Sequence, residues 1–198
     1  VISCDSNRSV LTDETVIAVQ PYAGFENKYA DTVKNALGEM YGVKVILLDD
    51  IVIPENAFVN IKSARYRADT LIHLLKDDKA YIEYDYVIGL IGEDISCTKY
   101  SDYETKTIKS PEHKYKDWGI FGLGFRPGKS CIVSSYRLHK STSKENFIER
   151  LKKVSCHEMG HNLGLPHCPN KDCIMQDAAE TIKTVDNVEL HLCDDCRN

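Results

Sequence analysis

Three histidines, one glutamate and one cysteine lie close together in the stretch HEMGHNLGLPHC, residues 157–168. His157 and His161 are four residues apart, so on a helix both imidazoles stand on one face and can bind a single ion. Glu158 is rotated from His157 by about one hundred degrees, which lets its carboxylate reach a water on that ion without becoming a ligand. These residue types at this spacing indicate a metal site with a general base.

A third imidazole follows a bend in the chain. Gly164 permits a left-handed turn and Pro166 prevents the helix from continuing, so His167 can return toward the same ion. Three histidines with a fourth position left for water are typical of catalytic zinc, because structural zinc sites are filled by protein ligands. Zinc would acidify that water, and Glu158 would accept its proton and pass it to a leaving amine. The predicted reaction is hydrolysis of a peptide bond.

The alternative is a helix face whose histidines are satisfied by carboxylates. In a chain of this composition, HExxH arises by chance with a probability of roughly 2%, and requiring Gly164 and His167 as well lowers this about five-hundredfold. We therefore favour the zinc site.

The cysteines indicate a second metal site. The chain has eight, and four of them, Cys168, Cys173, Cys193 and Cys196, are crowded near its end. Two cysteine pairs can hold a tetrahedral zinc ion, which folds a segment too small for its own core. Two disulfides or a redox-active CxxC are the alternatives, although no thioredoxin-like strand precedes Cys193.

The segments that must position these residues alternate between strand and helix patterns, which predicts an α/β layered domain. Strands are expected at 15–20, 44–49, 85–92, 119–125 and 131–135, and helices at 27–41, 67–76 and 142–163. The last helix begins at Thr142–Glu145, which fits a capping box. The polar stretch 96–117 is predicted to be a long loop, and the glycines of 119–125 indicate an edge strand or a close approach to the backbone by another chain.

The composition is that of one globular domain. The 198 residues are 42% hydrophobic and 28% charged, with a net charge of −5. The absence of a Lys/Arg stripe argues against nucleic-acid binding, and no apolar run reaches the roughly 18 residues of a membrane span. We expect a soluble monomer with a flexible tail at 1–14 and a single domain at 15–198.

Val1–Ile2–Ser3–Cys4 is similar to the end of a bacterial lipoprotein signal. If Cys4 is lipidated, the protein is a lipoprotein of the cell envelope. The alternative is an idle thiol in a frayed terminus of a cytoplasmic protein.

From His157 onward the sequence resembles the archaemetzincins, a branch of the metzincin zinc metallopeptidases. Their pattern is HExxHxxGxxHC, four residues, Cys, one residue, Met, seventeen residues and CxxC, and it is matched at every spacing. The resemblance implies that His157, His161 and His167 bind catalytic zinc, that Glu158 is the general base, and that the four C-terminal cysteines bind structural zinc. Two zinc ions per chain are therefore expected.

The same resemblance implies that Met175 lies in a Met-turn beneath the histidines. It implies a metzincin-like zincin domain with a twisted, mixed five-stranded sheet, a long active-site helix and an antiparallel edge strand, here 119–125, which could align a peptide or protein substrate. Gln176 and Asp177 stand where several metzincins have a tyrosine, so oxyanion stabilisation would fall to zinc and to a group in 96–117. The rival functions are a peptide-binding protein without catalysis and a zinc amidase acting on a non-protein substrate.

Overall fold

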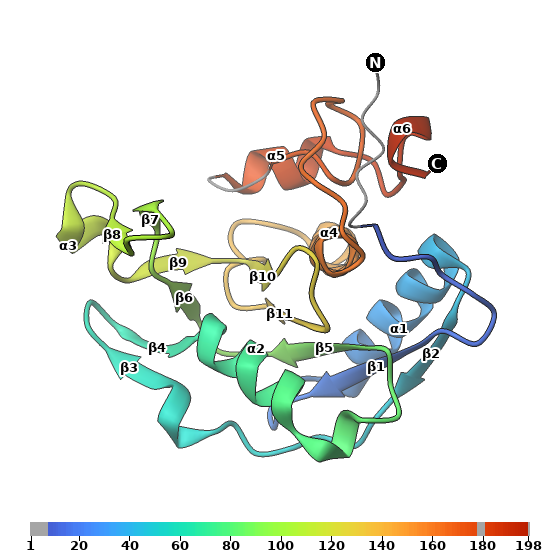
Figure 1. The fold of residues 1–198 in the computed structure, drawn as a ribbon, viewed down its shortest axis with the longest axis horizontal. Helices are drawn as coiled ribbons and strands as arrows, with labels where there is room; N and C mark the ends of the chain where they lie inside the picture. Colours follow the sequence, from blue (N-terminus) through green and yellow to red (C-terminus); the bar gives the residue numbers. More distant parts are fainter. Residues whose placement is uncertain (1–7, 178–180, 198) are drawn as a thin grey trace.

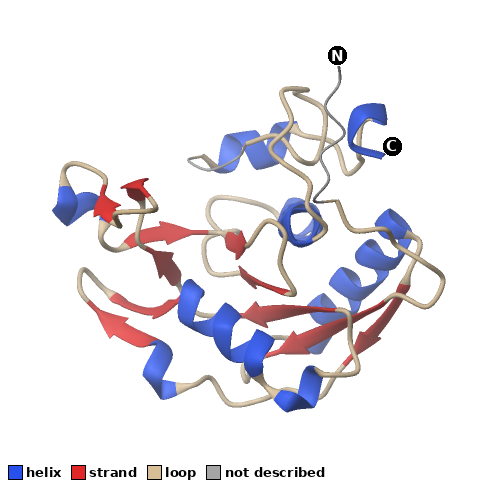
Figure 2. Cartoon of the chain, viewed as in Figure 1, coloured by secondary structure: helices blue, strands red, loops and turns tan. Residues whose placement is uncertain are grey.

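The computed structural model describes residues 8–177 and 181–197 (Figures 1 and 2). Its centre is a five-stranded sheet in the order β10-β11-β5-β1-β2. The strands are β1 Val16–Pro21, β2 Lys44–Leu47, β5 Tyr86–Ile91, β10 Gly122–Gly124 and β11 Ser130–Ser134. The β1, β2, β5 and β11 strands are parallel, and β10 pairs antiparallel with β11 at the edge. The predicted mixed α/β class is confirmed.

Helices cover both faces of this sheet, because its central strands are apolar on both sides. The α1 helix (Asn27–Tyr41) and the α4 helix (Lys144–Asn162) pack on one face, and α2 (Ala68–Asp77) packs on the other. Each face has its own buried cluster of apolar side chains. The α4 helix therefore rests on a rigid base formed by the sheet and α1.

The helix boundaries follow the apolar periodicity of the sequence. In α1 the buried residues Tyr29, Val33 and Leu37 repeat every four positions, and the helix spans the predicted 27–41. The predicted capping box has Thr142 as its N-cap residue, but the N-cap residue of α4 is Ser143, one position later. The Ser143 hydroxyl accepts a hydrogen bond from the Asn146 N–H at 3.3 Å, so the predicted capping box is wrong in register.

The prediction of a long loop at 96–117 is wrong. This stretch contains the end of β6 (Ile95–Cys97), the β7–β8 hairpin (Tyr100–Asp102 and Thr107–Ile108) and a short helix α3 (Glu112–Tyr115). These elements are polar and short, so they leave no apolar period to detect.

A second sheet, which we did not predict, has the order β3-β4-β6-β9. Its other strands are β3 Phe58–Asn60, β4 Ala64–Arg67 and β9 Trp118–Ile120. The predicted strand 119–125 is thus divided between two sheets, with β9 in the small sheet and β10 at the edge of the large one. Arg65 of β4 links the strands of the small sheet, because it forms ion pairs with Asp94 at 2.8 Å and Asp117 at 3.2 Å, which directly precede β6 and β9. Ion pairs therefore supplement apolar packing in this sheet.

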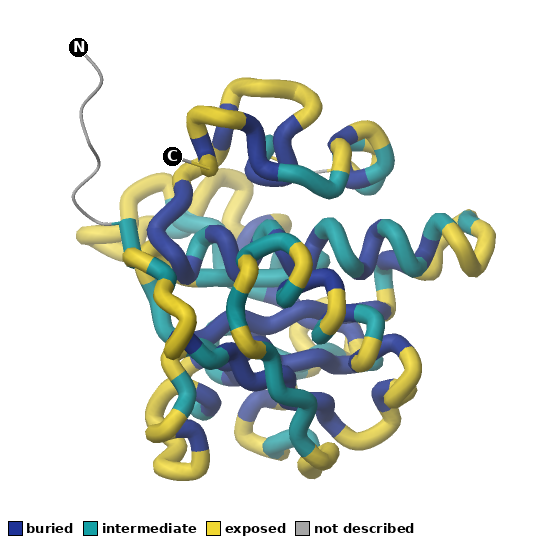
Figure 3. The backbone as a smooth tube through the Cα atoms, turned by 90° about the vertical axis from the view of Figure 1, so that its right-hand side faces the viewer, coloured by how far each residue is buried: buried dark blue, intermediate teal, exposed yellow. Residues whose placement is uncertain are grey.

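The remaining elements are two 3-10 turns, Glu55–Ala57 and Lys79–Tyr81, and two short helices near the end of the chain, α5 (Ile182–Asn187) and α6 (Asp194–Arg197). Figure 3 shows α4 with the sheet on one side and this C-terminal segment on the other. Arg150 of α4 fastens the segment, because its guanidinium makes two hydrogen bonds to the Asp186 carboxylate at 2.6 and 2.7 Å.

Residues 8–14 lie beside the same region. The Ser9 N–H donates to Leu163 O at 3.0 Å, and Arg8 donates to Cys196 O. Cys4 lies outside the described residues, so the flexible tail and the lipid anchor stay predictions. None of the helices in the described part of the chain has both the length and the apolar content that crossing a membrane requires.

Candidate active site

The end of α4 brings the three histidines together. His157 and His161 stand one turn apart, and the chain leaves the helix at Gly164 with a φ of 92°, a conformation that a residue with a side chain rarely adopts. The Leu165 N–H still donates to Gly160 O at 2.9 Å, so the turn is tight. His167 returns toward the helix, and its Nε2 lies 3.2 Å from His161 Nε2. The bend predicted from the sequence is present.

The spacing of the imidazole nitrogens fits a zinc ion. One ring nitrogen from each of the three histidines lies within 4.8 Å of the other two. Ligands about 2.05 Å from a tetrahedral zinc are roughly 3.3 Å apart, close to the separation of the His161 and His167 nitrogens. The site can hold the ion with small movements of side chains.

The opposite ring nitrogens are oriented by acceptors. His157 Nδ1 donates to Ile174 O at 2.8 Å, and His161 Nδ1 donates to Leu165 O at 2.9 Å. Both rings therefore present an unprotonated Nε2, as metal ligation requires. Burial, reinforced by the neighbouring imidazoles, lowers the pKa of His157 to about 3; burial also lowers that of His161 to about 4. Both imidazoles are neutral at pH 7.

His167 is the most exposed of the three, with 45% of its side chain accessible. Its Nδ1 lies 3.7 Å from Asp177 Oδ2. The sequence indicated Asp177 only as a residue that stands where other metzincins have a tyrosine. It did not predict that the Asp177 carboxylate lies next to the Nδ1 atom of His167, on the side of the ring away from the proposed metal.

Glu158 is buried between α4 and the edge strand β10. A Cβ added at Gly122 would lie 2.7 Å from Glu158 Cγ and 2.9 Å from its Oε1, so this strand needs glycine there. Within the chain, the close neighbour of these glycines is α4, since a Cβ added at Gly124 would lie 2.5 Å from Glu158 O. Burial raises the pKa of Glu158 to about 8, against the effect of a hydrogen bond from the Gly124 N–H, which lowers it. A cation at the histidines would lower this pKa by attracting the carboxylate.

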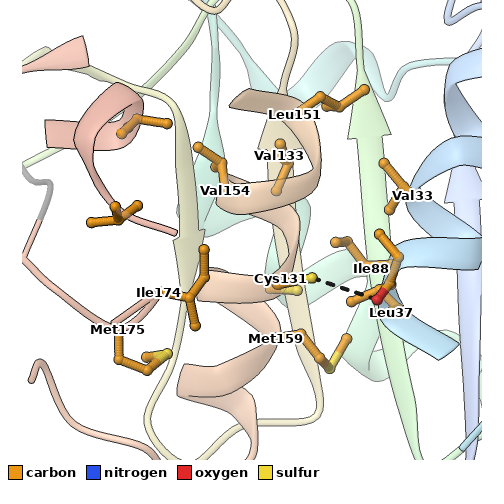
Figure 4. Close-up of a cluster of buried hydrophobic side chains, with 14 of the residues drawn as sticks. Val33, Leu37, Ile88, Cys131, Val133, Leu151, Val154, Met159, Ile174 and Met175 are labelled. Carbon is orange, nitrogen blue, oxygen red and sulfur yellow. Dashed lines mark hydrogen bonds between the residues drawn. The ribbon is translucent and has the colours of Figure 1, made fainter. Parts of the chain in front are cut away.

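Met175 is fully buried and packs against the histidine helix, on the left of the helix in Figure 4. Its sulfur would meet a Cβ added at Gly160, so the turn and the helix are in close contact. The Cys168 N–H donates to Met175 O at 2.8 Å, which ties the turn to the segment that follows His167. Met175 therefore packs against the helix that carries the histidines, and it is not a member of the three-histidine cluster.

The four C-terminal cysteines also converge. Their sulfurs all lie within 4.8 Å of one another, and the Sγ atoms of Cys168 and Cys193 are 3.6 Å apart. This separation exceeds the length of a disulfide bond and is close to the roughly 3.8 Å between two ligands of a tetrahedral Zn–S₄ site. The seven cysteines of the described chain are all free thiols. Cys156, which precedes His157, is fully buried.

A cleft of about 410 Å³ opens in front of the histidines and Glu158. Sequence reasoning missed several residues that line it: Cys97, Lys99, Tyr103, Trp118, Arg137 and Lys153. Lys99, Tyr103 and Cys97 come from the stretch predicted as a loop, and Tyr103 is 76% exposed. Their only signal in the sequence was that a long polar segment of a compact domain is often functional.

An α/β domain with an antiparallel edge strand above a helix that carries HExxH, and with a third histidine after a glycine turn, is the architecture of a zinc peptidase of the metzincin type. Comparison with known proteins defines the family. Residues 14–198 match the model of peptidase family M54, and the chain belongs to this family of zinc metallopeptidases.

Relatives carry the name archaemetzincin. The protein of Halobacterium salinarum is 40% identical over 86 residues, which are 39% of this chain and 49% of that one, so the match spans about half the length of this relative. The protein of Haloarcula marismortui is 29% identical over 82% of this chain and 86% of its own. The crystal structure of the Methanopyrus kandleri archaemetzincin superposes with a TM-score of 0.73 at 26% identity, covering 93% of this chain and 92% of that one. The Archaeoglobus fulgidus structure, at 22% identity and a TM-score of 0.71 over 92% and 98%, shows the same fold.

Proposed function

We propose that the chain is a zinc-dependent peptidase in which Glu158 is the general base. The observation that carries the proposal is the convergence of three imidazoles, with one pair of nitrogens 3.2 Å apart, beside a buried carboxylate in an open cleft. Zinc held by His157, His161 and His167 would polarise the peptide carbonyl and acidify the attacking water.

Glu158 performs the proton transfers. It accepts a proton from the attacking water and donates it to the leaving amine, so a pKa near the working pH suits it. The Gly124 N–H holds its carboxylate in place. Met175, as the Met-turn, keeps the floor of the site rigid.

The second part of the proposal is a structural zinc ion bound by Cys168, Cys173, Cys193 and Cys196, which gives two zinc ions per chain. The segment that carries these cysteines is short, and thiolate ligation would add to the stability that it gains from packing against α4. Elemental analysis of zinc-replete protein is expected to give two ions; one ion or none contradicts this part.

The substrate would be a peptide or protein that lies along the edge strand β10, whose outer side is unpaired in the sheet order. Oxyanion stabilisation would come from zinc, with Tyr103 the candidate donor from the 96–117 stretch because it lines the cleft. We also propose a monomer, and a lipid anchor if Cys4 is acylated; mass spectrometry of the natural N-terminus tests the anchor.

Glu158→Gln tests the mechanism. The variant should keep both zinc ions and lose at least a hundredfold in kcat, because general-base catalysis contributes about 10²–10⁴-fold. A variant that hydrolyses peptides at the normal rate contradicts the role of Glu158.

Digestion of a broad peptide library, with binding measured in parallel, separates the rival functions. Binding without cleavage indicates a peptide-binding protein, whereas cleavage of non-peptide amides alone indicates an amidase.

A further inference from the structure

Arg137 lines the cleft, and neither the proposed zinc site nor the proton transfers use it. Its guanidinium is pressed against β9, where it occupies the place that a Cβ of Gly119 would take. Gly119 and Gly122 are three residues apart, so their Cα atoms are separated by at most about 11 Å. Arg137 is therefore within two or three peptide residues of Glu158, which contacts Gly122.

The guanidinium is held in one orientation from behind. Arg137 Nε donates to Asp94 Oδ1 at 2.6 Å and Nη2 donates to Asp94 Oδ2 at 2.9 Å. Asp94 is itself fixed, because only 8% of its side chain is exposed and Arg65 Nε donates to it at 2.8 Å. Such two-point pairing fixes the plane of a guanidinium.

This pairing leaves one edge of Arg137 unused. Within residues 8–177 and 181–197, Nη1 has no hydrogen-bond partner, and 33% of the side chain is exposed. An Arg137–Asp94 ion pair that served only to join strands would not need the Arg137 guanidinium to line the cleft. The Nη1 donors are positioned for a ligand that enters it.

Other basic side chains lie near Arg137 or line the same cleft. Arg65 and Arg137 balance the carboxylates of Asp94 and Asp117. Lys153 adds a further positive charge, because its ammonium donates to the neutral carbonyl oxygens of Val185 and Asp186 at 3.2 Å.

Lys99 also lines the cleft, and its ammonium lies 5.2 Å from the centre of the Trp118 ring, so a cation–π contact holds this lysine beside β9.

We propose that Arg137 is a specificity residue that binds a carboxylate of the substrate through Nη1. The inference rests on the proposed peptidase function and narrows its substrate class. The preferred peptides carry an acidic side chain, or their free C-terminal carboxylate, within three residues of the scissile bond. Asp94 is the positioning residue, and Gly119 makes the room that the guanidinium needs.

The test uses zinc-loaded protein and matched peptides. One set replaces Glu by Gln at each position within three residues of the cleaved bond, and a second set compares free and amidated C-termini. A charge-assisted hydrogen bond contributes about 1.5–3 kcal/mol, so kcat/KM for the carboxylate peptide should exceed that of its neutral partner by roughly ten- to a hundredfold. The first set responds to a side-chain carboxylate and the second to a terminal one. Equal rates in both sets overturn the inference and leave the peptidase function standing.

Arg137→Gln should abolish the preference for carboxylate peptides while changing kcat/KM of the neutral partners less than threefold. Arg67→Gln is the matched control, because Arg67 makes a similar two-point pair with Asp69 and does not line the cleft. It should keep the preference. A preference that survives Arg137→Gln contradicts the role of Arg137.

Gly119→Ala provides a second variant if Arg137→Gln fails to fold. Its methyl group displaces the guanidinium without removing the charge, so the preference should fall at least fivefold; an unchanged preference in a folded Gly119→Ala protein overturns the inference.

Binding of the same peptides to Glu158→Gln, measured by fluorescence anisotropy, gives a readout that does not depend on turnover. Tighter binding of the carboxylate peptides supports the inference even if no peptide is cleaved, and equal binding contradicts it. Failure of cleavage alone would contradict only the peptidase function.

Discussion

Asn162 joins the end of the active-site helix to the sheet by hydrogen bonds, although no sequence pattern predicts this role. It follows His161 directly, is fully buried, and its Nδ2 donates to Phe125 O at 3.1 Å and to Ser130 O at 3.0 Å. The first acceptor follows β10 and the second is in β11. One amide group therefore fixes the end of α4 to both strands that border the site.

Replacing Asn162 by Ala should lower the free energy of unfolding by about 2–3 kcal/mol. Each lost hydrogen bond costs about 1 kcal/mol, and leaving two buried carbonyl groups without donors adds to that. Part of this is offset, because the buried Asn162 Oδ1 has no hydrogen-bond partner in the described chain and its removal is favourable.

The isosteric change Asn162→Asp separates donation from shape. It places a carboxylate oxygen against two carbonyl oxygens in a dry site, so it should cost more than Asn162→Ala, about 4 kcal/mol or more unless the acid is protonated. Urea unfolding at pH 7.5 and a fixed excess of zinc measures both changes, since bound metal contributes to apparent stability. If Asp is tolerated better than Ala, Asn162 acts by filling space and the reasoning fails.

Three further perturbations test other parts of the molecule. Gly122→Ala should keep both zinc ions and lose at least tenfold in kcat, because its methyl group would lie 2.7 Å from Glu158 Cγ; zinc content and peptide turnover check this, and normal turnover refutes it. The Arg150 hydrogen bond lowers the pKa of Asp186, so this pair stabilises the fold above about pH 4 and stabilises it less as the pH falls through the native pKa. The difference in free energy of unfolding between the natural chain and Asp186→Asn, measured by urea unfolding from pH 7 to 3, should therefore narrow with acid. A constant difference contradicts the pairing. Removal of zinc by a chelator should expose the amides of 181–197 to hydrogen exchange before those of β1 and β5, and uniform exchange would count against a structural zinc.

The features that were predictable from the sequence depend on short spacings. The two imidazoles of His157 and His161, the bend at Gly164 and the return of His167 lie within eleven residues, so local helix and turn geometry decides their positions. The C-terminal cysteine pairs are also local, apart from the one long connection that closes the cluster. The central strands and α1 were predictable because burial on one or two faces imposes a simple apolar pattern.

The features that were not predictable depend on contacts between distant segments. The small sheet is joined by Arg65, Asp94 and Asp117, and polar strands of this kind carry no apolar period. Arg137 reaches the cleft only because Asp94, forty-three positions away in the chain, turns its guanidinium there. Glu158 was predicted to be a base from its neighbours, whereas its burial under Gly122 required the fold.

The division of 118–124 between two sheets has a consequence for the cleft. On one continuous strand, Gly119 and Gly122 would face opposite sides, because side-chain directions alternate with a period of two. Here the chain passes from the small sheet to the large one at Phe121, between β9 and β10. The space at Gly119 is filled by Arg137 and the space at Gly122 by Glu158, and both of these side chains line the same cleft. The change of sheet is therefore what places the Arg137 guanidinium and the Glu158 carboxyl group along one wall, at a separation that a short peptide can span.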